Sequence, residues 1–216
     1  MRKKFVLLAV IGLLILPNLQ GCFPVVAAGA GVGVSAVVDR RSLGIQTEDE
    51  NIELKAMTRA GELIDKQAHL NFTSFNLKVL VTGEVPNAEA RAEVDRMVLA
   101  IPNVKRVYNE TTIGPASSLM NRSNDSYVTT KVKSRSLDLA KFNPLHVKVV
   151  TEAGIVYLMG MVTEQESKAA IQVARTTTGV RKVVNLFEII SPTKAKELEA
   201  NAGQNTSETP QTTQGN

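Results

Sequence analysis

The chain has no tryptophan, one cysteine and two histidines among its 216 residues, and aromatic side chains make up only 4% of it. A single cysteine excludes an intrachain disulfide, so the folded state must be stabilised by packing. With 44% apolar residues and so few aromatics, the core must be built from valine, leucine, isoleucine, alanine and methionine. The length predicts one or two small domains.

The chain also lacks a strong net charge once its first residues are set aside. Lysine and arginine total 25 and aspartate and glutamate total 21, which gives a formal charge of +4. Removing Arg2, Lys3 and Lys4 leaves 22 basic residues against 21 acidic ones. Bulk charge therefore gives no support for a nucleic-acid partner, and none is expected.

The first 21 residues have the three parts of a secretory signal peptide. A basic start is followed by an apolar run from Phe5 to Leu16, and Gly21 is a small residue directly before the cysteine. The apolar run of about a dozen residues is shorter than the ~20 residues of a membrane-spanning helix. We therefore expect residues 1–21 to be removed.

The segment Leu19-Gln20-Gly21-Cys22 resembles the lipobox of bacterial lipoproteins. The resemblance implies that Cys22 becomes the first residue of the mature chain and carries an S-diacylglycerol and an N-acyl group such as palmitate. Gln20 departs from the commonest lipobox pattern. An ordinary cleaved signal with an incidental cysteine is the alternative.

A valine-, alanine- and glycine-rich run follows Cys22 and carries no charge until Asp39. At ~16 residues it is short for a membrane span, and its glycines make a poor helix. We expect a pliable linker near the bilayer, with a second span as the alternative. Phe23, rather than aspartate, follows the cysteine, and this resembles bacterial lipoproteins that are sorted to the outer membrane rather than retained in the inner membrane.

From Glu48 onward, apolar periodicity predicts two copies of one small unit. The predicted segments are a signal peptide at 1–21, a lipidated linker at 22–47, a first domain at 48–114, a linker at 115–122, a second domain at 123–191 and a disordered polar tail at 192–216. The first unit is expected to have a helix with Ile52, Ala56, Ala60, Leu63 and Ile64 on one face, strands at 70–73 and 77–85, a helix at 88–100 and a strand at 104–113. The second is expected to have a helix bearing Val128, Val132 and Leu139, strands at 146–151 and 155–162, a helix at 164–177 and a strand at 180–190.

The two units match position by position. Asp49 matches Asp125, and both are expected to cap the first helix of their unit. The order helix–strand–strand–helix–strand gives a hairpin, then a right-handed crossover to a parallel strand. The predicted fold is therefore α+β: two αββαβ two-layer sandwiches, each with a three-stranded mixed sheet and two helices.

Two glycines occupy equivalent positions near strand ends, and the tail has a different composition. Gly83 and Gly160 are expected to be structural, allowing close backbone approach or a bulge. After Pro192 the chain becomes rich in polar residues. Because it has too few apolar residues to offset its ordering entropy, the tail is predicted to be disordered.

Together these features resemble the dual BON-domain outer-membrane lipoproteins. The features that carry this resemblance are the segment at Cys22, the repeated unit, Val81-Thr82-Gly83 and Leu158-Met159-Gly160. The most specific of them is the run from Ser123 to Ser134. The resemblance implies a periplasm-facing protein anchored in the inner leaflet of the outer membrane. It implies a second domain that binds anionic phospholipids such as phosphatidylglycerol and cardiolipin, a role in membrane integrity, and enrichment at the division site.

The first helix of the second unit has an outward face compatible with that role. Tyr127, Thr130, Lys131 and Ser134 share the face at three- and four-residue spacing, and Lys133 lies on its flank. Each cation near an anionic bilayer contributes about 1 kcal/mol, and a tyrosine ring suits the headgroup level. An ordinary solvated helix face is the alternative from the residues alone.

The equivalent helix of the first unit carries Glu50, Glu53, Lys55 and Arg59. Acidic and basic side chains are balanced there, so this face has no basic bias. The phospholipid site is therefore assigned to the second unit.

No catalytic or metal-binding pattern is expected. His69 and His146 lie in different units without a nearby cysteine, and they are expected to be strand-edge or loop residues. No G-x-S-x-G motif occurs, so we expect a protein that is not an enzyme and has no cofactor beyond its covalent lipid. The rival function is an adaptor or quality-control factor that binds envelope assembly proteins through a sheet edge or helix face.

Overall fold

The computed structural model describes residues 39–63, 68–139 and 142–205. The expected signal peptide, Cys22 and most of the predicted linker at 22–47 lie outside these ranges, as does Ile64. Among the described helices, none is long and apolar enough to cross a membrane.

The secondary-structure elements follow the predicted order twice. The first unit contains α2 (Leu43–Leu63), β1 (His69–Phe75), β2 (Lys78–Val85), α3 (Ala88–Leu99), β3 (Arg106–Asn109) and β4 (Thr112–Ile113). The second contains α4 (Leu119–Leu139), the 3-10 turn η2 (Pro144–His146), β5 (Val147–Glu152), β6 (Ile155–Val162), α5 (Glu164–Arg175) and β7 (Lys182–Ile189). In both units the first two strands are antiparallel and the last strand is parallel to the second. The predicted α+β fold is confirmed.

The closing strand of the first unit is broken into two pieces. Both β3 and β4 pair with β2, and Glu110 and Thr111 separate them. At the break, Asn109 Oδ1 accepts hydrogen bonds from the amide (3.2 Å) and hydroxyl (2.6 Å) of Thr111. The equivalent Asn185 accepts from the amide of Phe187 at 3.0 Å, although β7 is continuous there.

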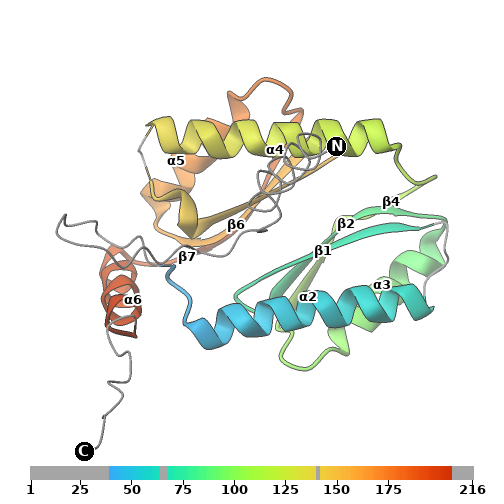
Figure 1. Ribbon diagram of the computed structural model, residues 1–216, viewed down its shortest axis with the longest axis horizontal. Helices are drawn as coiled ribbons and strands as arrows, with labels where there is room; N and C mark the ends of the chain where they lie inside the picture. The colour runs from blue at the N-terminus through green and yellow to red at the C-terminus, as the bar shows by residue number, and fades with distance from the viewer. Residues whose placement is uncertain (1–38, 64–67, 140–141, 206–216) are drawn as a thin grey trace, which may run out of the picture. The chain divides into compact units, whose positions relative to one another are not determined.

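In each unit the two crossing helices cover one face of the sheet (Figure 1). The first core joins α2, α3 and the inner face of β1 and β2, and its largest fully buried members are Ile52, Val79, Val81, Val85, Val94, Val98 and Ile101. The second core joins α4 and α5 to β5 and β6, and it includes Val128, Val132, Val149, Val156, Leu158, Val162 and Val173. Each fully buried valine, leucine or isoleucine contributes about 1.5–3 kcal/mol. The side chains of Leu63 and Leu139 lie outside the described residues.

A third apolar cluster joins the opposite faces of the two sheets. Phe75 and Leu80 of the first unit meet Tyr157 and Met159 of the second. Burial, together with the nearby charges of Glu110 and Glu152, raises the pKa of Tyr157 to about 12, so its hydroxyl stays neutral. The central strands are therefore buried on both faces, which explains their nearly continuous apolar sequences. We name this contact the domain seam.

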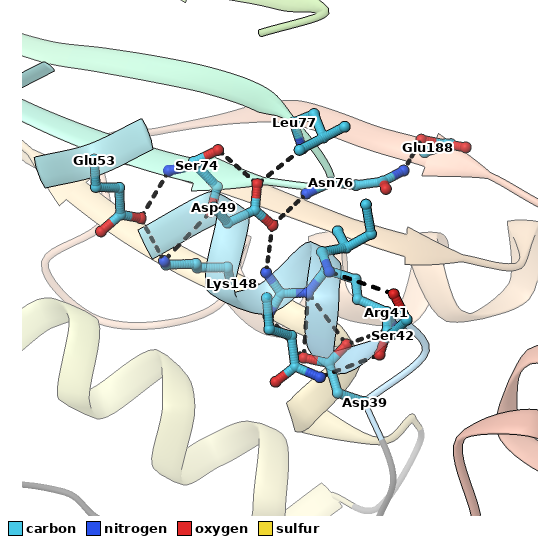
Figure 2. A network of polar contacts seen from close by, with 12 residues as sticks. Asp39, Arg41, Ser42, Asp49, Glu53, Ser74, Asn76, Leu77, Lys148 and Glu188 are labelled. Carbon is cyan, nitrogen blue, oxygen red and sulfur yellow. Dashed lines mark hydrogen bonds and ion pairs between the residues drawn. The ribbon is translucent and has the colours of Figure 1, made fainter. Parts of the chain in front are cut away.

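Polar contacts border the domain seam (Figure 2). Glu188 accepts hydrogen bonds from Asn76 (2.9 Å) and from Lys78 (2.6 Å) of the other unit. Lys148 Nζ donates to Glu53 Oε1 at 2.9 Å. Partly exposed ion pairs of this kind contribute little energy individually. They join β2 to β7 and α2 to β5 at the border of the domain seam.

Asp49 lies inside α2, and the prediction that it caps this helix is wrong. Its carboxylate accepts hydrogen bonds from the amides of Asn76 and Leu77, each at 2.8 Å, and from the hydroxyl of Ser74 at 2.6 Å. Arg41 donates to the same carboxylate at 2.7 Å (Figure 2). Asn76 and Leu77 both have positive φ, of 52° and 65°, which is costly for residues other than glycine. Asp49 therefore stabilises the β1–β2 turn rather than a helix end.

Asp125 repeats this arrangement, and its predicted capping role is also wrong. It is buried within α4 and accepts hydrogen bonds from the amides of Ala153 (2.9 Å) and Gly154 (2.8 Å) in the β5–β6 turn. The helix starts six residues earlier, where Ser118 Oγ accepts from the amide of Asn121 at 3.2 Å. Consequently α2 and α4 each begin inside a segment predicted to be a linker.

The polar tail is not disordered over its described part, because residues Pro192–Asn205 form helix α6. Ser191 Oγ accepts a hydrogen bond from the amide of Lys194 at 3.1 Å, and Ala195 is 4% exposed. Glu199 accepts hydrogen bonds from Arg40 at 2.7 and 3.0 Å. A serine cap, one buried alanine and this long-range ion pair order the helix.

Arg40 holds together three segments that are distant in sequence. Besides Glu199, its guanidinium donates to both carboxylate oxygens of Glu166, at 2.9 Å each, and to the carbonyl of Met161 at 2.8 Å. Arg40 is 5% exposed, so this is a buried, bidentate pair. Glu166 also closes a capping box with Thr163 at the start of α5. We name Arg40, Glu166 and Glu199 the arginine clamp.

Candidate functional site

From Asp125 to Leu137, helix α4 has one buried side and one exposed side. Val128 and Val132 are each 1% exposed and pack in the second core. Thr129 Oγ1 donates to Thr151 Oγ1 of β5 at 2.7 Å, which fixes the rotation of the helix over the sheet. The opposite side of the helix, which includes Tyr127, Thr130 and Ser134, consequently faces solvent.

The exposed side carries large apolar residues as well as the predicted polar ones. Met120 is 78% exposed, Tyr127 61% and Leu137 65%. These three residues lie seven and ten residues apart, so they fall along one stripe of the helix. Exposed side chains of this size, aligned on one helix, are typical of a surface that meets a membrane or another apolar partner.

An open hollow of about 660 Å³ lies beside this stripe. It is lined by Tyr127, Thr130, Lys131, Ser134, Arg135, Thr176, Thr177 and Thr178. The structure thus brings together four of the five residues predicted for phospholipid binding. The fifth, Lys133, is exposed on the flank of α4 and does not line the hollow.

The α5–β7 loop supplies the second wall of the hollow, and sequence reasoning missed it. Lys131 Nζ donates to the carbonyl of Thr178 at 2.5 Å, and Arg135 donates to the hydroxyl of Thr177 at 2.9 Å. Gly179 has φ +101°, and a Cβ there would lie 3.0 Å from Val128 Cγ2. The signal in the sequence was the run of three threonines followed by this glycine.

The chemistry of the hollow is cationic, hydroxylated and partly aromatic. Lys131 Nζ lies 4.5 Å from the centre of the Tyr127 ring, which is a cation–π contact. Thr130 Oγ1 donates to the carbonyl of Ser126 at 3.0 Å, which leaves its lone pairs able to accept. Lysine and arginine favour phosphate oxygens, and arginine binds them in a forked geometry. The arrangement therefore fits an anionic, phosphate-containing group.

The matching helix of the first unit has different surroundings. Glu53 faces β1 and the domain seam, because it accepts hydrogen bonds from the amide of Ser74 (2.8 Å) and from Lys148. Lys55 lies 3.7 Å from Glu48 in an ion pair. Glu48 and Glu53 of α2 are thus each paired with a lysine, whereas in the described ranges no basic side chain of α4 forms an ion pair.

The two histidines lie in separate acidic surroundings. His69 begins β1, and its Nδ1 lies 3.1 Å from Glu84 Oε2. His146 is buried at the end of η2, and its Nδ1 lies 3.8 Å from Glu166 and 3.9 Å from Glu199 of the arginine clamp. Over the described ranges, His69, Glu84 and Glu152 form the one group of at least three histidine or acidic side chains placed to hold a metal ion.

Comparison with known proteins gives a match to the BON domain family over residues 48–115 and 124–191. The chain is 34% identical over 174 residues to the Outer membrane lipoprotein DolP of Haemophilus influenzae, covering 80% of this chain and 90% of that protein. It is 32% identical over 155 residues to the 21 kDa hemolysin of Actinobacillus pleuropneumoniae, covering 71% of this chain and 80% of that protein.

Proposed function

Because the chain belongs to the BON domain family, we propose that it is an outer-membrane lipoprotein whose second domain binds anionic phospholipids through the exposed side of α4. The observation that carries the proposal is the hollow between α4 and the threonine loop, where cations, hydroxyls and an exposed ring converge. In this proposal the protein is not an enzyme. It faces the periplasm and supports outer-membrane integrity.

Binding divides between two parts of the α4 surface. Lys131 and Arg135, with the hydroxyls of Thr130 and Ser134, bind the phosphate and glycerol of the headgroup. Met120, Tyr127 and Leu137 rest at the level where headgroups meet acyl chains, as amphipathic helices in the interface do. Each cation contributes about 1 kcal/mol at an anionic surface, so two or three of them give weak binding.

Lipid attached to Cys22 makes this weak binding effective. A chain held at the membrane meets headgroups at a high effective concentration, so contacts too weak for a free protein become significant. One acyl anchor together with a basic surface gives firmer and composition-dependent retention. Retention of this kind would concentrate the protein where anionic lipid is enriched, such as the division site.

We expect the double variant Tyr127→Ala, Lys133→Glu to lose binding to phosphatidylglycerol and cardiolipin vesicles. Both side chains are exposed, so the fold should be retained, while one charge reversal and one lost ring each weaken the membrane contact. Flotation with protein-free vesicles measures the loss, using the chain Phe23–Asn216, which contains every described residue and has no acyl anchor.

The control is Asn51→Ala, Lys55→Glu on α2, which makes one truncation to alanine and one lysine charge reversal on the corresponding helix of the first unit. It should float like the parent chain. Raised salt should release the parent chain, because exposed charges are screened. Equal flotation of the α4 and α2 variants would remove the α4 surface from the account.

A second candidate function, an adaptor that binds envelope assembly proteins, is favoured by a groove between the two sheets. The terminal strands β1 and β5 of the two sheets border an open groove of about 530 Å³. A strand at a sheet edge can pair with an extended polypeptide. Under this alternative the protein binds an envelope assembly protein in the groove, and the chain Phe23–Asn216 fails to float with vesicles.

A further inference from the structure

Three ligand-type side chains meet at the domain seam, outside the surface proposed for phospholipid. His69 starts β1, Glu84 lies opposite it in β2, and Glu152 ends β5 of the second unit. One side-chain nitrogen or oxygen from each lies within 4.8 Å of the other two. The Nδ1 of His69 and the Oε2 of Glu84 are 3.1 Å apart.

The charge at this point is not balanced by a basic side chain. Glu84 and Glu152 are each 8% exposed, and in the described ranges neither carboxylate lies within 4 Å of a lysine or arginine nitrogen. Arg122, which lines the same groove, donates to the carbonyl of Ser117 instead. Buried carboxylates need a compensating positive charge, which a bound cation supplies.

Neighbouring groups hold the two carboxylates in place. Glu152 Oε2 accepts hydrogen bonds from Asn71 Nδ2 (2.9 Å) and from Thr82 Oγ1 (3.1 Å). Glu84 Oε2 accepts from the amide of Ser117 at 3.0 Å. Ligating carboxylates are typically oriented by hydrogen bonds of this kind.

We propose that His69, Glu84 and Glu152 bind one divalent transition-metal ion, best matched by zinc, and that this ion links the two domains. One imidazole and two carboxylates are ligands that zinc accepts, with a further position for water. Zinc bonds of ~2.0–2.2 Å at tetrahedral angles place neighbouring ligand atoms about 3.4 Å apart, close to the spacing of His69 and Glu84. A divalent cation also cancels the two negative charges.

The ion has a route to these ligands. His69 and Glu152 both line the open groove between β1 and β5, so solvent reaches the cluster from outside. Since His69 and Glu84 belong to the first unit and Glu152 to the second, zinc would add a bond across the domain seam. Binding to the folded state alone stabilises it in proportion to the logarithm of zinc concentration.

Zinc titration of the chain Phe23–Asn216, after removal of metal with a chelator, tests the proposal. This chain contains every described residue and omits the thiol of Cys22. We expect one zinc per chain by calorimetry, and an unfolding temperature that rises with zinc concentration. Glu152→Gln should lower zinc affinity at least tenfold, while its amide oxygen still accepts from Asn71 and Thr82. His69→Gln should do the same.

Glu188→Gln is the matched control, because Glu188 lies at the same seam but outside the cluster. It should bind zinc like the parent chain. Failure of the parent chain to bind zinc stoichiometrically would overturn the proposal and leave a hydrogen-bonded His69–Glu84 pair. Equal affinity in the parent, His69→Gln and Glu152→Gln chains would also overturn it, since zinc would then bind elsewhere.

Discussion

Replacing Gly160 by alanine should lower the free energy of unfolding by about 3–5 kcal/mol, and Gly83→Ala should do the same. The added Cβ would lie 2.2 Å from the carbonyl oxygen of His146 in the first case and 2.0 Å from that of His69 in the second. Both glycines have positive φ, of 159° and 112°. The strain is unavoidable because the clashing atoms are backbone atoms, at the first residue of β1 for Gly83 and directly before β5 for Gly160, and they cannot move without disturbing the sheet.

Gly61→Ala provides the matched control, since it is the same chemical change on a surface helix. Nothing lies within 4 Å of the Cβ that it would add to α2. Alanine is a better helix former than glycine, so this variant should gain about 0.5–1 kcal/mol. Urea unfolding followed by circular dichroism measures all three variants. Gly83→Ala and Gly160→Ala chains as stable as the parent would show that the strands can separate without cost.

Arg40→Met should lower the free energy of unfolding by about 2–4 kcal/mol at neutral pH. The substitution keeps much of the aliphatic volume but leaves the Glu166 carboxylate buried beside Glu199 without its counter-charge. Lys168→Met is the control, because Lys168 pairs with Glu164 on the exposed side of α5 and should contribute little. If Arg40→Met lowers the free energy of unfolding by no more than Lys168→Met does, the structural role of the arginine clamp is refuted.

The arginine clamp also predicts how stability depends on pH. Burial alone would raise the pKa of Glu166, but hydrogen bonds from Arg40 and Thr163 outweigh it and lower the pKa from 4.5 to about 2. A carboxylate with a depressed pKa stabilises the fold above its unfolded pKa and loses that contribution as pH falls from about 4.5 towards 2. After allowance for solvent screening this contribution is about 1–2 kcal/mol. The difference in free energy of unfolding between the parent chain and Arg40→Met should therefore become smaller as the pH is lowered from 6 to 3.

Local periodicity was sufficient to predict the two units and their strand order. The strand Ile155–Val162 was predicted with its observed ends, because a short continuous apolar run and the turn before it define it without help from the rest of the chain. The apolar stripe of α4 at Val128 and Val132 was predicted for the same reason. The repeat itself supported both predictions, since each unit acted as a check on the other.

Features that depend on distant contacts could not be predicted in this way. Asp49 and Asp125 precede apolar helical positions, as capping residues do, yet they bind turns about 28 residues further along. Helix α6 has a polar sequence, and its pairing with Arg40 spans 159 residues. No local pattern distinguishes a carboxylate with such a partner from one without it.

The same reasoning explains what was missed at the candidate sites. On α4 the outward residues were identified because helical spacing alone groups them. The threonine loop at 176–178 reaches them only through the fold, with Gly179 allowing the approach. Glu152 lies one residue beyond the strand predicted at 146–151, whereas it ends β5 in the structure, and its meeting with His69 and Glu84 across the domain seam went unpredicted.

The measurement that tests the central claim most directly uses the absence of tryptophan from the chain. Tyr127→Trp introduces a single tryptophan on α4, and Asn51→Trp introduces one at the matching position of α2. We expect the emission of Tyr127→Trp to shift to shorter wavelength with phosphatidylglycerol or cardiolipin vesicles, to stay unchanged with phosphatidylcholine vesicles, and to return at high salt. Asn51→Trp should not respond to either lipid. Unchanged emission from Tyr127→Trp in anionic vesicles, or equal shifts at both positions, would contradict binding of phospholipid by the α4 surface.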